Sequence, residues 1–137
     1  MELKRPRRSV YIMRTEILGG GRTKVGVSVC VQGRHRVLRR HRKLRDLRIV
    51  REWPRNGDAF RIERLVCQIL RPYRVGHEYF DVSAAHACRV VTSVSRLLDR
   101  GWTPGQVAEK YGVARQTIYI RFNSERIAQL RADGEQE

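Results

Sequence analysis

Two short apolar runs on either side of a glycine-rich turn restrict this chain more than any other feature. The turn is residues 19–21 (GGG), and the flanking runs contain residues 10–12 (VYI) and 24–26 (KVG). Such runs joined by glycines are typical of a β-hairpin, because glycine adopts the positive φ angles of tight turns. We therefore predict two paired strands, over residues 9–14 and 23–29.

The residues after this hairpin indicate a mixture of helices and strands that ends near residue 98. Apolar residues recur first at helical spacing, then alternate as in a strand, and then return to helical spacing. The fold class expected is α/β, with a small sheet flanked by helices. The predicted elements are helices over residues 34–44, 58–70 and 84–100, a strand over 47–53, a loop over 72–76 and an extended segment over 79–82.

The first two of these helices have apolar faces that we expect to be buried. In the first, the buried face would comprise Val37, Leu38, His41 and Leu44, and arginines that include Arg39 and Arg40 would cover the rest as a phosphate-binding surface. In the second, Asp58 would cap the helix and the buried stripe would comprise Ala59, Ile62, Val66 and Ile69.

A helix-turn-helix is predicted after Gly101. Thr103, Pro104 and Gln106 form a capping-box pattern that starts a helix to Lys110, and a second helix would run from about residue 114 to 130. The segment resembles the helix-turn-helix of resolvases and invertases; an ordinary helical hairpin is the alternative. The resemblance implies that Arg115, Gln116 and Thr117 read bases, while Tyr119 and Arg121 contact the DNA backbone.

We accordingly predict three parts of the chain. A first domain with a basic tail covers residues 1–98, the DNA-binding segment covers 99–132, and an acidic tail covers 133–137. Whether the first two parts fold as one unit is left open, and so is a homodimer.

The net charge of the chain indicates a polyanionic partner. Lys and Arg number 29 against 14 Asp and Glu, for a formal net charge of +15. An excess of this size favours DNA, with an RNA-binding accessory protein or a membrane-surface protein as weaker alternatives. The three cysteines and four histidines lack zinc-site spacing, and no run is long enough to span a membrane. We expect a protein of the bacterial or phage-infected cytoplasm.

The hairpin also carries residues that resemble the GIY-YIG nuclease superfamily. Tyr11 matches the tyrosine of the first signature tripeptide and Gly26 matches the glycine of the second. A phage and bacterial branch often has a lysine where Lys24 stands, and residues 76–82 (GHEYFDV) resemble its closing segment. The resemblance spans about residues 9–95. Two departures are Val10, where the family has glycine, and Cys67, where the branch often has histidine.

The resemblance implies a DNA endonuclease that uses a divalent metal such as Mg²⁺. Tyr11 would be the general base, Arg34 or Arg36 the phosphate clamp, Lys24 an electrostatic support and Glu63 the metal ligand. Phosphodiester hydrolysis needs residues of these types. A base deprotonates the attacking water, a guanidinium group binds two phosphate oxygens, and a carboxylate holds the metal.

Two other interpretations stay open for these residues. Tyr11 would also suit a packed strand position, and Glu63 a solvated helix position. The alternative function is a catalytically inactive DNA-binding or regulatory protein on the same scaffold.

Overall fold

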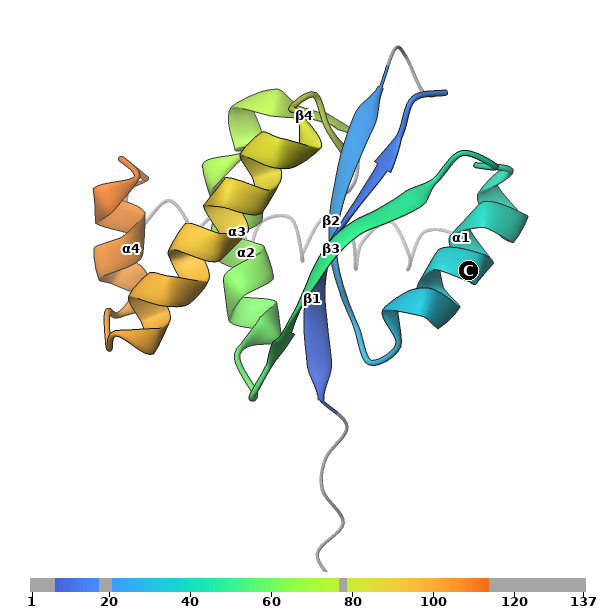
Figure 1. Cartoon of the computed structure of the whole chain (residues 1–137). Helices are drawn as coiled ribbons and strands as arrows, with labels where there is room; N and C mark the ends of the chain where they lie inside the picture. Colours follow the sequence, from blue (N-terminus) through green and yellow to red (C-terminus); the bar gives the residue numbers. More distant parts are fainter. Residues whose placement is uncertain (1–6, 18–20, 77–78, 114–137) are drawn as a thin grey trace, which may run out of the picture.

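The chain folds into a sheet with helices on both faces. The computed structural model describes residues 7–17, 21–76 and 79–113. Helix α1 covers one face of the sheet, α2 and α3 cover the other, and α4 lies beyond them (Figure 1). The elements are β1 (Arg8–Thr15), β2 (Arg22–Ser28), α1 (Val31–Arg42), β3 (Arg48–Arg55), α2 (Ala59–Ile69), the 3₁₀ turn η1 (Arg71–Tyr73), β4 (Arg74–Gly76), β5 (Tyr79–Phe80), α3 (Ala84–Asp99) and α4 (Pro104–Lys110).

The predicted hairpin is confirmed and forms the centre of the sheet. The strand order is β3-β1-β2-β5-β4, and every neighbouring pair is antiparallel. Strand β1 lies between β2 and β3, so α1 connects two strands that run parallel to each other on either side of β1. The pairing of β1 with β2 sets Tyr11 opposite Gly26 and Met13 opposite Lys24.

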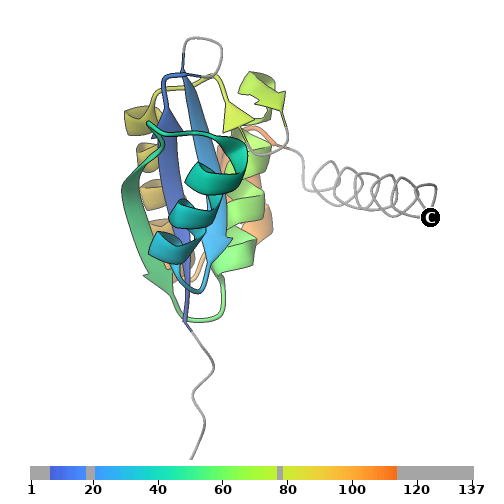
Figure 2. The ribbon, with the colours of Figure 1, turned by 90° about the vertical axis from the view of Figure 1, so that its right-hand side faces the viewer.

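Alternation along β1 divides the core into two layers. Val10 and Ile12 pack with α2 and α3, whereas Tyr11 and Met13 pack under α1. Neighbouring residues of a strand point to opposite faces, so each strand supplies both layers. Figure 2, viewed from the α1 side, shows α1 in front of the strands.

Helix α4 completes the larger core layer. Its capping box is formed as predicted: Thr103 Oγ1 accepts from Gln106 N at 3.2 Å and Gln106 Oε1 accepts from Thr103 N at 2.8 Å. Val107 and Ala108 are fully buried among residues of α2 and α3. The predicted base- and backbone-contacting residues lie outside the described residues: Arg115, Gln116, Thr117, Tyr119 and Arg121.

The predicted buried face of α1 is wrong in part. Leu38 and Leu44 are buried, but Val37 is 44% exposed and His41 is also exposed. The helix begins earlier than expected, at Val31, because Cys30 caps it, its Sγ accepting from Gly33 N at 3.3 Å. The early start makes the sheet-facing stripe pass through Val31 and Leu38, seven residues apart, so Val37 is rotated away by about 100°.

Strand β3 and the stretch after α2 also differ from expectation. Strand β3 continues through Pro54 to Arg55 instead of ending at residue 53. Proline is tolerated there because β3 is an edge strand, on which half of the amides need no ladder partner. The predicted loop over 72–76 contains the turn η1 and strand β4. Asp58 does not cap α2 with its side chain.

Asp58 binds Arg55 instead, and Arg55 ties three elements together. Its Nε and Nη2 donate to the Asp58 carboxylate at 3.0 and 2.9 Å, and Nη1 and Nη2 donate to Asp99 at 3.1 and 2.5 Å. The hydrogen bonds to Asp58 first, and then to Asp99, raise the pKa of Arg55. The guanidinium thereby joins the end of β3 to the start of α2 and the end of α3.

Arg55→Gln is expected to lower the free energy of unfolding by about 1–3 kcal/mol, because glutamine cannot hold both carboxylates and leaves Asp58 half-buried without its cation. Urea denaturation would measure this loss. Arg45→Gln, at an exposed position, is the matched control and should change little. Equal midpoints for the two variants would show that Arg55 adds nothing to the packing of these elements.

Candidate active site

The ring of Tyr11 lies directly against the backbone of Gly26. A Cβ atom built on Gly26 would lie 2.7 Å from Tyr11 Cε2 and closer still to Cζ and the hydroxyl oxygen. Tyr11 is only 2% exposed. Glycine is thus required opposite this tyrosine because any side chain would take the space of the ring. The two residues matched to the signature tripeptides form one packing unit.

Lys24 lies on the same face of the sheet as Tyr11. It is opposite Met13, two residues along β1 from Tyr11, and cross-strand partners share a face. Lys24 is 3% exposed, and its Nζ lies 5.2 Å from the centroid of the Tyr79 ring. The Lys24 side chain therefore lies in a buried setting beside the Tyr79 ring, where electrostatic interactions are stronger than in water.

The predicted arginines lie on the outer surface of α1, above this face. Arg34, Arg36, Arg39 and Arg40 are all exposed. Arg34 is three residues after Val31 and four before Leu38, so it flanks the buried stripe of the helix, whereas Arg36 points away from it. The helix geometry therefore favours Arg34 over Arg36 as the cation next to the Tyr11 layer.

Glu63 lies in a different layer from Tyr11. Its helix, α2, packs Ile62 and Val66 on the face opposite α1, and the Glu63 side chain is half-buried. Along β2, only Thr23 and Lys24 pair with β5. Within the described ranges the edge of β2 beyond Lys24 has no strand beside it. The structure places α2, which carries Glu63, and the Tyr11 ring on opposite faces of the sheet.

The donor set available for a metal is small. In residues 7–17, 21–76 and 79–113 no three His, Cys, Asp or Glu side chains gather as a ligand cluster. His77 and Glu78 fall outside those ranges. Glu63 would hold a cation as a lone carboxylate, which leaves most coordination positions to water and phosphate and suits Mg²⁺ better than zinc.

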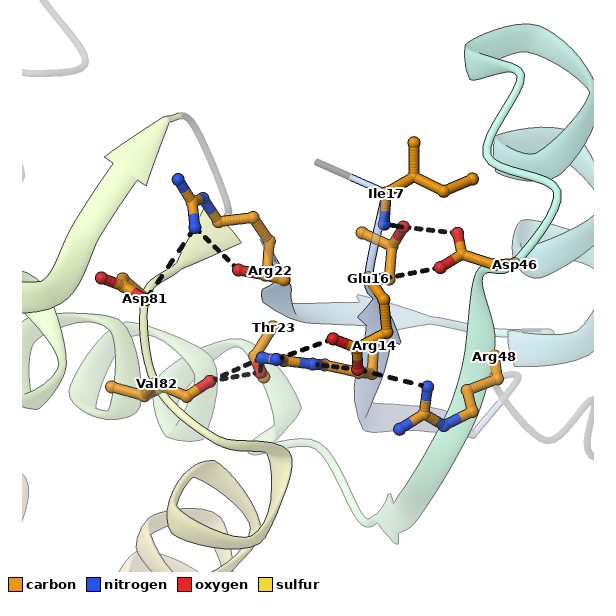
Figure 3. Close-up of polar contacts among 11 residues, drawn as sticks. Arg14, Glu16, Ile17, Arg22, Thr23, Asp46, Arg48, Asp81 and Val82 are labelled. Carbon is orange, nitrogen blue, oxygen red and sulfur yellow. Dashed lines mark hydrogen bonds and ion pairs between the residues drawn. The ribbon is translucent and has the colours of Figure 1, made fainter. Parts of the chain in front are cut away.

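Arg14, which the sequence analysis did not identify, forms hydrogen bonds at the end of the hairpin that lies next to its turn. Its Nη1 donates to Thr23 Oγ1 and to the Val82 carbonyl, each at 3.0 Å, and Nε donates to Glu16 at 2.9 Å (Figure 3). Thr23 Oγ1 donates to the same carbonyl at 2.6 Å. The hydrogen bond with Glu16 raises the pKa of Arg14 and lowers that of Glu16. This network fixes the segment after β5 against β1 and β2.

Asp46 fixes the end of β1 from the other side. Its carboxylate accepts from Thr15 Oγ1 and from the Glu16 amide, both at 2.5 Å (Figure 3). These two hydrogen bonds, the Thr15 one first, lower the pKa of Asp46. The loop before β3 is thereby attached to the hairpin. The sequence provides little indication of this contact. It offers only a polar residue at a strand end, Thr15, and an acidic residue far along the chain in a loop.

Asp46→Asn is expected to destabilise the fold at neutral pH, because the amide nitrogen that replaces one oxygen cannot accept from the Glu16 N–H. A depressed folded-state pKa stabilises the fold above the ordinary aspartate pKa of about 4 and loses that effect as pH falls through the folded value. The difference in Tm between wild type and variant should therefore shrink on acidification.

Thermal unfolding at neutral pH and at about pH 3 tests this dependence. Asp81→Asn is the matched control, since the exposed Asp81 carboxylate lies 3.8 Å from Arg22 Nη1. The control should show a smaller difference in Tm at neutral pH. A difference for Asp46→Asn that stays constant with pH would contradict the assigned hydrogen bonds.

Comparison with known proteins adds a family assignment. No curated protein and no solved structure matches the chain. Within the described ranges, no helix is both long enough and apolar enough to cross a membrane. Residues 8–96 match the T5orf172 domain, which is phage-associated and related to nuclease-type domains. This match covers β1 to the greater part of α3, and the chain accordingly belongs to the T5orf172 domain family.

Proposed function

We propose that this protein is a DNA endonuclease that hydrolyses phosphodiester bonds with a divalent metal. The observation that carries the proposal is the packing of Tyr11 on Gly26, with the buried Lys24 on the same face of the sheet. A lysine on the same face of the sheet would favour loss of the Tyr11 proton, because a nearby cation stabilises a phenolate. The family assignment, with its relation to nuclease-type domains, agrees with this function.

In the proposed mechanism each residue acts on one part of the phosphodiester. The Tyr11 hydroxyl oxygen, once deprotonated, takes a proton from the attacking water. The water oxygen then bonds to phosphorus, and the bond from phosphorus to the leaving oxygen breaks. Arg34, beside the Tyr11 layer, would hold the non-bridging oxygens and offset the charge that develops on them.

Glu63, on α2, is the residue proposed to hold the metal. A Mg²⁺ ion bound there would supply charge relief to the phosphate and orient the leaving oxygen. The carboxylate would provide one hard oxygen ligand for the metal, and Glu63 is half-buried on α2. Lys24 would act as an electrostatic support on the Tyr11 face of the sheet, and the reaction needs no proton from it.

Glu63→Gln is expected to abolish metal-dependent nicking of supercoiled plasmid while leaving DNA binding in place, because the amide is a poor metal ligand of the same shape. Agarose gels with Mg²⁺ and with EDTA would measure nicking, and fluorescence anisotropy would measure binding. Glu109→Gln, at an exposed position of α4, is the matched control and should nick like wild type.

A DNA-binding protein without catalysis is the second candidate function. The exposed arginines of α1 and the net charge of +15 favour phosphate binding whether or not the chain cuts. Val10 and Lys24 stand where the nuclease signatures have glycine and tyrosine. Tight binding by wild type with no cleavage under several divalent metals would support this candidate against the nuclease.

A further inference from the structure

A groove on the molecule is lined by five cationic side chains from three different elements. It lies between β3, α3 and α4 and has a volume of about 460 Å³. None of the described residues that line it is an aspartate or a glutamate. The cationic residues are Arg51, Arg89, Arg96, Arg100 and Lys110, and the other lining residues are Cys88, Thr92, Ser93 and Leu97.

Helix geometry aligns most of these cations in one row. Arg89, Arg96 and Arg100 are spaced by seven and four residues, which places them on one face of α3. At 1.5 Å per residue the row extends over about 16 Å. One strand of duplex DNA carries a phosphate for each 3.4 Å of axis, so the row is long enough to follow several consecutive phosphates.

Aromatic rings position the cations at the two sides of the row. The guanidinium carbon of Arg51 lies 4.8 Å from the centroid of the Trp53 ring, and Lys110 Nζ lies 5.6 Å from that of Trp102. Stacking on a ring restricts a long side chain without neutralising its charge. The groove is therefore a partly preorganised set of cations, with no acid among the described residues that line it.

Hydroxyl groups add neutral donors on the floor of the groove. Ser93 Oγ accepts from the Tyr111 hydroxyl at 2.5 Å, which leaves the Ser93 proton to donate elsewhere. Thr92 lies beside it in the lining. Serine and threonine hydroxyls together with arginines are the groups that contact phosphate oxygens in protein–DNA complexes.

We propose that this groove binds the phosphate backbone of duplex DNA, at a surface separate from the site of cleavage. The proposal rests on the proposed function only in taking DNA as the partner. Helix α3 covers the sheet face opposite α1 (Figure 1), and the Tyr11 ring packs under α1. Neither Tyr11, Arg34 nor Glu63 is among the residues that line the groove. Arg100 and Lys110 lie after residue 96, where the family match ends, so two of the five cations of the groove come from outside the matched region.

Removal of two groove arginines tests the proposal. Binding of Arg89→Gln/Arg96→Gln to a duplex is measured by anisotropy in EDTA over a series of salt concentrations. Each lost phosphate contact reduces the slope of log K against log[salt] by about 0.9, so the expected reduction approaches 2. Arg45→Gln/Arg61→Gln removes the same charge at exposed positions outside the groove and should leave the slope near that of wild type. Equal slopes for the two variants would overturn the proposal.

Cys88 provides a second readout inside the groove. Duplex DNA should slow alkylation of the Cys88 thiol, as peptide mass spectrometry would record. Burial raises the pKa of Cys88, so alkylation is followed at mildly alkaline pH. Equal alkylation of Cys88 with and without DNA would count against the proposal.

Inorganic tripolyphosphate distinguishes a small anion from a DNA backbone as the source of the phosphates. If the groove serves a small polyphosphate, the groove variant loses tripolyphosphate binding and keeps wild-type affinity for DNA, and the proposal fails. Because these assays contain no metal, they do not depend on cleavage. Loss of nicking in Glu63→Gln with an unchanged salt slope separates the proposed nuclease from this groove.

Discussion

Tyr11→Phe is expected to lower the rate of DNA cleavage by about 10²- to 10⁴-fold, the range usually lost with a general base. The substitution removes only the hydroxyl group and keeps the ring that packs on Gly26. Because the packing of the ring is retained, the variant should still fold and its DNA affinity should stay close to that of wild type. A fall in rate with an unchanged fold would assign the hydroxyl to the chemistry rather than to the core.

Tyr73→Phe is the matched control for this experiment. It removes the same group from a ring that is 48% exposed and lies in η1. Cleavage by this variant should equal that of wild type in single-turnover assays with saturating enzyme. If Tyr11→Phe also cleaves at the wild-type rate, Tyr11 is a packing residue and another group must accept the proton.

Gly26→Ala is expected to lower the free energy of unfolding by about 3 kcal/mol, at the upper end of the usual cost of overpacking. The added Cβ would lie 2.7 Å from Tyr11 Cε2, within a buried sheet where neither strand is free to move. A loss of this size corresponds to a fall in Tm of about 10 °C in a domain of this length. Calorimetry or thermal circular dichroism would record it.

The control and the double variant make this prediction specific. A Cβ on Gly76 would meet nothing within 4 Å, so Gly76→Ala should change Tm little. Tyr11→Ala removes the ring that the added Cβ would meet. In the Tyr11→Ala background, Gly26→Ala should therefore cause little further loss of unfolding free energy, so the two substitutions should be strongly non-additive. Additive losses would show that the alanine is accommodated in another way.

Local patterns in the sequence were sufficient to predict the main elements. The two runs of the hairpin and the capping box at Thr103 both correspond to elements in the structure, because each depends on neighbours within a few residues. The Tyr11–Gly26 pair was also predictable, since a hairpin with a short turn sets the register of its strands.

Features that depend on distant contacts were not predictable in the same way. The burial of α1 depends on where Cys30 starts the helix and on which side the sheet lies. The bonds of Arg14 to Val82 and of Asp46 to Thr15 join residues 68 and 31 positions apart. The α3 row was visible in principle, from arginines at helical spacing, but Arg51 and Lys110 reach the groove only through the tertiary fold.

The composition of β3 has a consequence for how the folded protein behaves at high concentration. This outer strand exposes Arg48, Arg51 and Glu52 and contains Pro54, which has no amide hydrogen to donate. Charges and proline on an exposed strand discourage a second chain from adding its own strand there, which is a common route to aggregation. The exposed charges and the proline of β3 therefore oppose growth of the sheet by self-association along this edge.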